Sequence, residues 1–105
     1  MMNKIEIKFL DKTNTILLSG ELLIENVRFA HNQLLTIFNS LECNNITFCF
    51  KELKHCDIVG IQLFLSMIKS LASKNINFNI INLNKSITDL INRHGLDDSG
   101  NFNSR

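Results

Sequence analysis

The sequence predicts a single-domain α/β protein with the element order β-β-α-β-α-β-α. Segments in which apolar and polar residues alternate are interleaved with longer segments in which apolar residues recur every three or four positions, as strands and helices do. The length of 105 residues fits one domain and leaves no room for a second. We expect residues 1–96 to form the domain and residues 97–105 to form a flexible tail.

The first two strands are predicted on either side of a polar turn. Apolar residues alternate with charged residues over residues 5–9, and a second strand-like stretch covers residues 15–19. The turn at residues 11–14 is too short for a crossover, so the two strands should be antiparallel. Gly20 and Glu21 are expected to end the second strand.

A first helix is predicted over about residues 25–41. Its apolar side chains recur at helical spacing, at Val27, Ala30, Leu34, Ile37, Phe38 and Leu41. Glu25 in the first turn would interact favourably with the positive end of the helix dipole. Alternating residues predict a third strand over residues 46–50, and residues 51–56 are expected to form a loop.

A second helix is predicted after this loop and runs to about Lys74. Asp57 is expected to cap its N-terminus by accepting hydrogen bonds from the backbone N–H groups two and three residues on. A fourth strand is predicted over residues 77–83. A third helix is expected to open at Ser86 with a capping pattern and to stop at Gly95.

These connections predict a four-stranded, mostly parallel sheet. Each strand–helix–strand crossover should be right-handed, and two crossovers without a reversal place the second, third and fourth strands side by side and parallel. The first strand then pairs antiparallel at the edge. Both crossover helices cover the same side, so the helices should pack mainly on one face of the sheet.

Composition excludes several classes of function. The formal net charge of +1 favours neither nucleic acid nor a membrane surface as a partner. No apolar run approaches the roughly 20 residues of a membrane helix, so we expect no direct membrane insertion. No signal peptide is recognised, which favours the cytoplasm. Cys43, Cys49 and Cys56 are an odd number of cysteines and are expected to be reduced thiols.

Signals for catalysis are poor. The four glycines are far apart, and no pair of histidines or cysteines has metal-binding spacing. His55, Cys56 and Asp57 are adjacent, but adjacent residues rarely point at one ion, so we expect no metal and no cofactor. A Cys56 nucleophile oriented by His55 is the enzymatic alternative to a non-enzymatic protein. His31 and His94 are expected on helix surfaces.

Three segments, in order along the chain, resemble the STAS domain family of anti-sigma factor antagonists. Residues 18–27 resemble its opening, residues 57–65 stand where the family carries Asp-Ser-Ala-Gly-Leu before an apolar helix, and residues 82–86 and 94–96 match its last strand and helix. The resemblance covers about residues 4–96 and implies the same α/β fold. It also implies a regulatory protein-binding domain.

The sequence departs from the family at the position of the phosphoacceptor. Ile58 stands where the family has Ser or Thr, and it has no hydroxyl to phosphorylate. Cys49 stands where the family has an acidic residue in its third strand. Three interpretations of Ile58 stay open: a tolerated apolar residue in a divergent copy, a permanent docking contact, or a misalignment by one or two residues.

A partner-binding surface is therefore predicted at the start of the second helix, where a strand end meets free backbone N–H groups. Its residues are Asp57, Ile58, Val59, Gly60, Ile61 and Gln62. The resemblance implies a protein partner, namely an anti-sigma-type serine kinase, a chemotaxis kinase complex or an ABC transporter subunit. The alternatives are a small subunit of a lipid-transport ABC complex and a thiol-dependent sensor or enzyme using Cys56. A monomer or weak homodimer is expected.

Overall fold

The computed structural model describes residues 4–93, and their element order confirms the predicted one. The elements follow one another as β1 (Ile5–Leu10), β2 (Thr15–Leu22), η1 (Ile24–Asn26), α1 (Val27–Asn39), β3 (Asn45–Cys56), α2 (Ile58–Ser73), β4 (Asn77–Ile81) and α3 (Lys85–Arg93). Only the short 3₁₀ turn η1 was not expected as a separate element.

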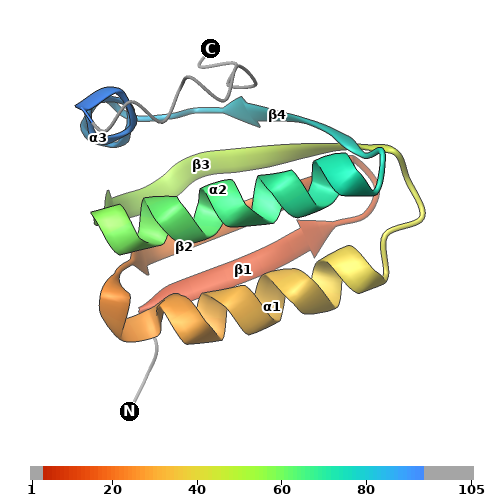
Figure 1. Ribbon diagram of the computed structural model, residues 1–105, viewed down its shortest axis with the longest axis horizontal. Helices are drawn as coiled ribbons and strands as arrows, with labels where there is room; N and C mark the ends of the chain where they lie inside the picture. The colour runs from red at the N-terminus through yellow and green to blue at the C-terminus, as the bar shows by residue number, and fades with distance from the viewer. Residues whose placement is uncertain (1–3, 94–105) are drawn as a thin grey trace.

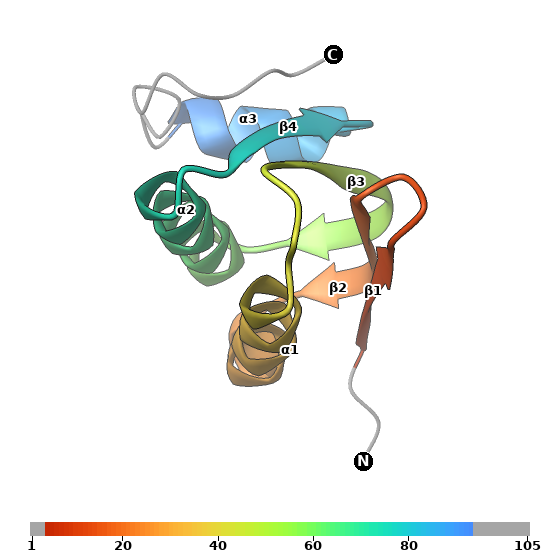
Figure 2. The same cartoon turned by 90° about the vertical axis from the view of Figure 1, so that its right-hand side faces the viewer.

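The four strands form one sheet in the order β1-β2-β3-β4. β1 is antiparallel to β2, whereas β2, β3 and β4 are parallel to one another. Helices α1 and α2 lie on the same face of this sheet, and α3 lies at its β4 edge (Figures 1 and 2). The α/β fold class, with a mostly parallel sheet and an antiparallel first strand, is thus confirmed. Within residues 4–93, no helix has both the length and the apolar character needed to cross a membrane.

Aromatic side chains fill the space between the sheet and the two helices. Phe48 lies at the centre, with its ring edge-to-face against Phe64 of α2 at a centroid distance of 4.8 Å, and Phe50 meets the same ring at 5.1 Å. Phe38 and Phe78 complete the cluster at 6.4 and 6.2 Å from Phe48. Such edge-to-face pairs add about 0.5–1.5 kcal/mol each beyond the burial of the rings. This cluster fixes α1 and α2 against β3.

The second strand is longer than predicted. Gly20 does not end β2, because the strand continues to Leu22. Gly20 has a φ of 103°, a conformation that side-chain-bearing residues rarely adopt, and a Cβ atom here would collide with the carbonyl oxygen of Lys4. The backbone N–H of Glu21 donates to that same oxygen at 2.7 Å. The glycine therefore lies inside β2, at one of its register shifts against β3, and does not terminate the strand.

The third strand was also underestimated, because residues 51–56 were predicted to be a loop and belong to β3. The register between β2 and β3 shifts at two places, and at each of them β3 holds one residue more than β2. Ile46, Phe48 and Phe50 of β3 are buried two positions apart, Cys49 is buried between the last two, and the next buried residue is Leu53. Because each such bulge adds one residue, it breaks the alternation by which a strand is recognised.

Three other boundaries also move, namely the end of β4 and both ends of α1, which stops at Asn39 and not at about residue 41. The first helix, α1, begins at Val27, so Glu25 belongs to the preceding turn η1 and not to the helix itself. Strand β4 ends at Ile81 because Asn82 adopts a φ of 63°, outside the strand region. The predicted second helix is confirmed within one residue at each end.

The third helix is capped by a different residue than predicted. Asn84 precedes α3, and its Oδ1 accepts a hydrogen bond from the backbone N–H of Ile87 at 2.8 Å. Its Nδ2 donates to the carbonyl oxygen of Leu53 at 3.2 Å, which ties α3 to the end of β3. Ser86 therefore lies inside the helix and does not open it. The predicted stop at Gly95 and the tail at residues 97–105 lie outside the described residues.

Candidate functional site

Asp57 joins two segments that are far apart in the sequence. It is the N-cap of α2, and its Oδ1 accepts from the backbone N–H of Gly60 at 2.9 Å, as expected for the residue three positions on. Its Oδ2 accepts from the backbone N–H of Ile24 at 2.9 Å. A single carboxylate therefore fixes the turn between β2 and α1 against the start of α2.

A buried amide fixes the same turn from within. Asn26 is only 7% exposed, and its Nδ2 donates to the carbonyl oxygen of Glu21 at 2.7 Å. Its Oδ1 accepts from the backbone N–H of Leu23 at 2.9 Å. Both polar ends of this buried side chain are therefore satisfied, which stabilises the observed conformation of the turn.

The turn presents an apolar side chain to solvent. Ile24 is 63% exposed, the highest value among the exposed large apolar residues of the described chain. Its backbone is bonded to the carboxylate of Asp57, so it lies beside the first residue of α2, the half-buried Ile58. Sequence reasoning missed Ile24. The sequence feature that could have identified it is an apolar residue between a strand and a helix, at a position that fits neither the strand period of two nor the helix period of 3.6.

Gly60 allows α2 to approach the end of β2. A Cβ atom at this position would collide with the carbonyl oxygen of Leu22 and lie 2.9 Å from the Leu22 Cγ and 3.0 Å from the Cys56 Sγ. The carbonyl oxygen of Leu22 also accepts from the backbone N–H of Asp57 at 3.2 Å. No side chain fits here without a backbone shift, which explains a glycine at this place in the helix.

The six predicted partner-binding residues divide into two sets. Ile58 and Val59 are half-buried and Gln62 is exposed, so these three side chains reach solvent. Gly60 is buried and Ile61 is only 1% exposed, so both belong to the interior beneath the surface. A contact surface at the start of α2 would therefore consist of the first set together with Ile24.

The surroundings of His55 and Cys56 do not favour the enzymatic alternative, a Cys56 nucleophile oriented by His55. Successive residues of a strand point to opposite faces, and His55 is exposed whereas Cys56 is half-buried. Burial, with a smaller contribution from the charge of Asp57, raises the pKa of Cys56 to about 12. The thiol stays protonated at neutral pH, which opposes a nucleophilic role. Within residues 4–93, no three His, Cys, Asp or Glu side chains converge to hold a metal ion.

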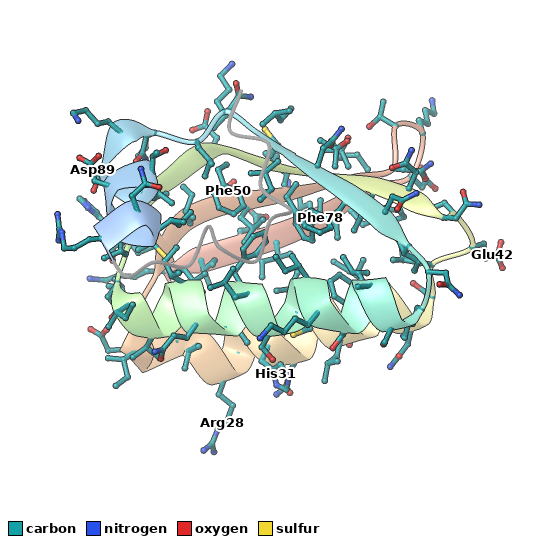
Figure 3. The ribbon with its side chains drawn as sticks, turned by 45° about the horizontal axis from the view of Figure 1, so that its top comes forward. Arg28, His31, Glu42, Phe50, Phe78 and Asp89 are labelled. Atoms are coloured by element: carbon teal, nitrogen blue, oxygen red, sulfur yellow. The ribbon has the colours of Figure 1, made fainter. Side chains whose placement is uncertain are left out.

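The remaining histidines and cysteines of residues 4–93 lie away from Asp57. Cys49 is in the middle of β3, where its Sγ is 3.5 Å from the Nδ2 of Asn82, so it is not part of the surface at the start of α2. Cys43 lies in the connection between α1 and β3. His31 projects from α1 on the side away from the sheet (Figure 3). His94 lies outside the described residues.

Comparison with known proteins identifies the family. The family model of the STAS domain matches residues 4–105. No curated protein matches the chain. The fold is similar to that of an anti-sigma factor antagonist from Mycobacterium paratuberculosis, with a TM-score of 0.75 and 14% identity over 95% of this chain and 82% of that one.

Two further solved structures are similar. A putative anti-sigma factor antagonist from Thermotoga maritima has a TM-score of 0.73 and 18% identity, covering 96% of this chain and 86% of that one. The Bacillus cell fate determinant SpoIIAA in its phosphorylated form has a TM-score of 0.67 and 16% identity, covering 96% and 90%. The chain belongs to the STAS domain family, and its fold is the regulatory protein-interaction fold that anti-sigma factor antagonists share.

Proposed function

We propose that this protein is a non-enzymatic regulatory module that binds a protein partner through the start of α2. The docking surface consists of Ile24, Asp57, Ile58, Val59 and Gln62, with Gly60 and Ile61 buried beneath it. The observation that carries the proposal is the bridge from Asp57 to Ile24 and Gly60, which holds an exposed apolar side chain in a fixed place.

The energetics of Ile24 support a binding role. An exposed isoleucine contributes little to folding, whereas covering its side chain in a complex would contribute about 1.5–3 kcal/mol. Fixing the turn in advance lowers the entropy that a partner must remove on binding. Asp57 and Asn26 supply that order through hydrogen bonds that already exist in the free protein.

The identity of residue 58 supports partner binding that is not regulated by phosphorylation at this position. One of the similar structures is a phosphorylated antagonist, but Ile58 offers no hydroxyl at the position that resembles the acceptor. A phosphate dianion at this place would add about two negative charges beside the Asp57 carboxylate. An apolar residue there instead extends the surface begun by Ile24.

The partner that best fits this surface is an anti-sigma-type serine kinase, in the cytoplasm. The family resemblance carries this choice, and a chemotaxis kinase complex is the other signalling partner of the same kind. The second candidate function is a small subunit of a lipid-transport ABC complex. Co-purification with a nucleotide-binding subunit, and not with a kinase, would favour that candidate.

Titration calorimetry with the anti-sigma-type kinase encoded in the same genome tests the proposal. Wild-type affinity is expected to be the same before and after incubation with ATP, with no phosphoryl group at residue 58. Ile58→Ser restores a hydroxyl, and its binding is expected to become sensitive to ATP. A fall in wild-type affinity after incubation with ATP would contradict the proposal that phosphorylation does not regulate this surface. No binding with or without ATP would exclude this class of partner.

A further inference from the structure

A cavity opens next to the docking surface, between α3 and the junction of β3 with α2. Its volume is about 410 Å³, and its lining residues are Cys56, Lys85, Ser86, Asp89, Leu90 and Arg93. Cys56 directly precedes Asp57, so the cavity and the docking surface are neighbours. Figure 1 shows α3, the start of α2 and the turn after β2 at the same end of the molecule.

One face of α3 supplies the charges of this cavity. Lys85, Asp89 and Arg93 are four residues apart, so they lie on one side of the helix. The Nζ of Lys85 lies 3.2 Å from the Oδ2 of Asp89, so Asp89 offsets part of the charge of Lys85. Within residues 4–93, no carboxylate forms an ion pair with Arg93. The cavity is therefore lined by two cations, Lys85 and Arg93, and one carboxylate, Asp89, and no carboxylate of residues 4–93 is paired with the Arg93 guanidinium.

The opposite side of α3 holds the helix in place independently of these charges. Ile87 and Ile91 are 1% and 4% exposed and pack into the core. Asn84 caps the helix and bonds to the end of β3 through the carbonyl oxygen of Leu53. Arg93 is exposed, so its charge is available to a ligand without any change in the fold.

We propose that this cavity receives a carboxylate of the docked partner, an Asp or Glu side chain, with Arg93 as its main ligand. A guanidinium matches a carboxylate with two parallel hydrogen bonds, which fixes orientation as well as charge. Lys85 adds a second positive charge, partly offset by Asp89. This inference rests on the proposed function: Ile24 and Ile58 supply apolar contact, and the cavity sets the register of the partner.

An NMR titration of the full chain tests the cavity without any partner. The probe is N-acetylglutamate N-methylamide, and its neutral control is N-acetylglutamine N-methylamide. We expect saturable amide shifts at Ser86, Asp89 and Arg93 with the carboxylate and binding about tenfold weaker with the neutral control. Arg93→Gln should abolish the difference, whereas Asp89→Asn should strengthen carboxylate binding. Equal shifts with both probes, or shifts away from α3, would overturn the proposal.

Inorganic phosphate is the competing probe. If phosphate binds the cavity more tightly than the glutamate probe, the cavity is a phosphate site and the carboxylate proposal is wrong. We expect the reverse order, because the side-chain methylene groups of the glutamate probe can also pack against Leu90 in the lining of the cavity, whereas phosphate has no apolar part.

Binding of the kinase partner separates this inference from the proposed function. Arg93→Gln is expected to weaken binding about tenfold, and the matched control Arg28→Gln, on the exposed side of α1 (Figure 3), is expected to change nothing. If Ile58→Glu weakens binding and Arg93→Gln does not, the cavity proposal alone fails. If neither substitution weakens binding, the docking surface itself is wrong.

Discussion

The two ends of the sheet both carry a cavity, but they are built differently. The cavity beside α3 has a volume of about 410 Å³, and the one at the opposite end has about 500 Å³. Asp89 and Glu42 mark these two ends in Figure 3. The larger cavity is lined by Phe9 of β1 and by residues of turns and connections, namely Asp11, Asn14, Ser40, Glu42 and Cys43. Cavity size therefore does not distinguish the docking end.

The difference lies in how each end is held. At the docking end, the side chain of Asp57 bonds to Ile24 across 33 residues of sequence. At the opposite end, the side-chain hydrogen bonds recorded for Thr13, Thr15 and Ser40 join residues at most three apart. The opposite end is also joined across 33 residues, but through the backbone, where the N–H of Thr47 donates to the carbonyl oxygen of Asn14 at 2.9 Å. The end at Asp57 differs in having a side-chain bond of that range, which fixes an exposed turn. Preorganisation of the turn at Ile24, more than volume or exposure, is the property on which the proposed docking surface rests.

The largest expected effect comes from Gly60→Ala, which forces α2 away from β2. Overpacking of this kind costs about 1–3 kcal/mol, so the free energy of unfolding in urea should fall by that amount. Ser66→Ala, on the exposed side of the same helix, is the control and should stay within about 0.5 kcal/mol of wild type. Equal stability of the two variants would mean that the close approach at Gly60 is not required.

A somewhat smaller loss is expected for Asp57→Ala. Removing an N-cap costs about 0.5–2 kcal/mol, and this variant also frees the backbone N–H of Ile24. Urea unfolding measures the first effect, and faster hydrogen exchange at the Ile24 amide measures the second. Asp11→Ala, in the turn at the other end, should change neither. If it destabilises as much as Asp57→Ala, the two ends do not differ as described.

Cys56 gives a test that is independent of partners. Burial raises its pKa from 9.0 to about 12, so the thiolate that reacts with iodoacetamide is scarce at pH 7.5. Alkylation of Cys56 should be about a hundredfold slower in the folded protein than in urea. Fast alkylation in the folded state would revive the thiol-dependent alternative.

The same shift makes stability depend on pH. Unfolding lowers the pKa of this thiol toward 9.0, so the unfolded state loses the Cys56 proton first as the pH rises. The contribution of Cys56 is therefore fully present below about pH 9 and is lost as the pH approaches 12. Urea midpoints of wild type and Cys56→Ala should converge over this range.

The smallest effects are expected for the charges of the opposite end. Asp11→Asn and Glu42→Gln alter exposed side chains and should change the free energy of unfolding by no more than about 0.5 kcal/mol. Partner affinity should also stay within twofold of wild type. A loss of affinity in either variant would mean that the partner binds at the end of the sheet opposite to Asp57, against the proposal.

The sequence predicted the element order and the sheet because apolar periods of two and 3.6 persist through most of the chain. It failed over residues 51–56, where two bulges change the spacing of the buried residues after Phe50. It also failed at Gly20, because a glycine at an irregularity inside a strand and a glycine that ends a strand look alike in sequence. Local periodicity cannot report a shift in register against a distant strand.

The sequence predicted only those parts of the candidate site that depend on local interactions. The cap at Asp57 is a local interaction with Gly60, so the sequence alone identified it. The second bond of Asp57, to Ile24, depends on the packing of β2 beside β3 and has no local signature. Ile61 was predicted to belong to the surface, but its side chain is buried because α2 packs against the sheet on that side. Its position next to Gly60 in the sequence does not report this burial.

Paired substitutions at the two ends test the central claim most directly. Ile24 and Leu10 are exposed apolar residues, 63% and 44% exposed, at opposite ends of the sheet. Calorimetry with the kinase partner should show that Ile24→Asp weakens binding about 10- to 100-fold, whereas Leu10→Asp stays within twofold of wild type. Equal losses, or a larger loss for Leu10→Asp, would contradict the assignment of the docking surface to the end held by Asp57.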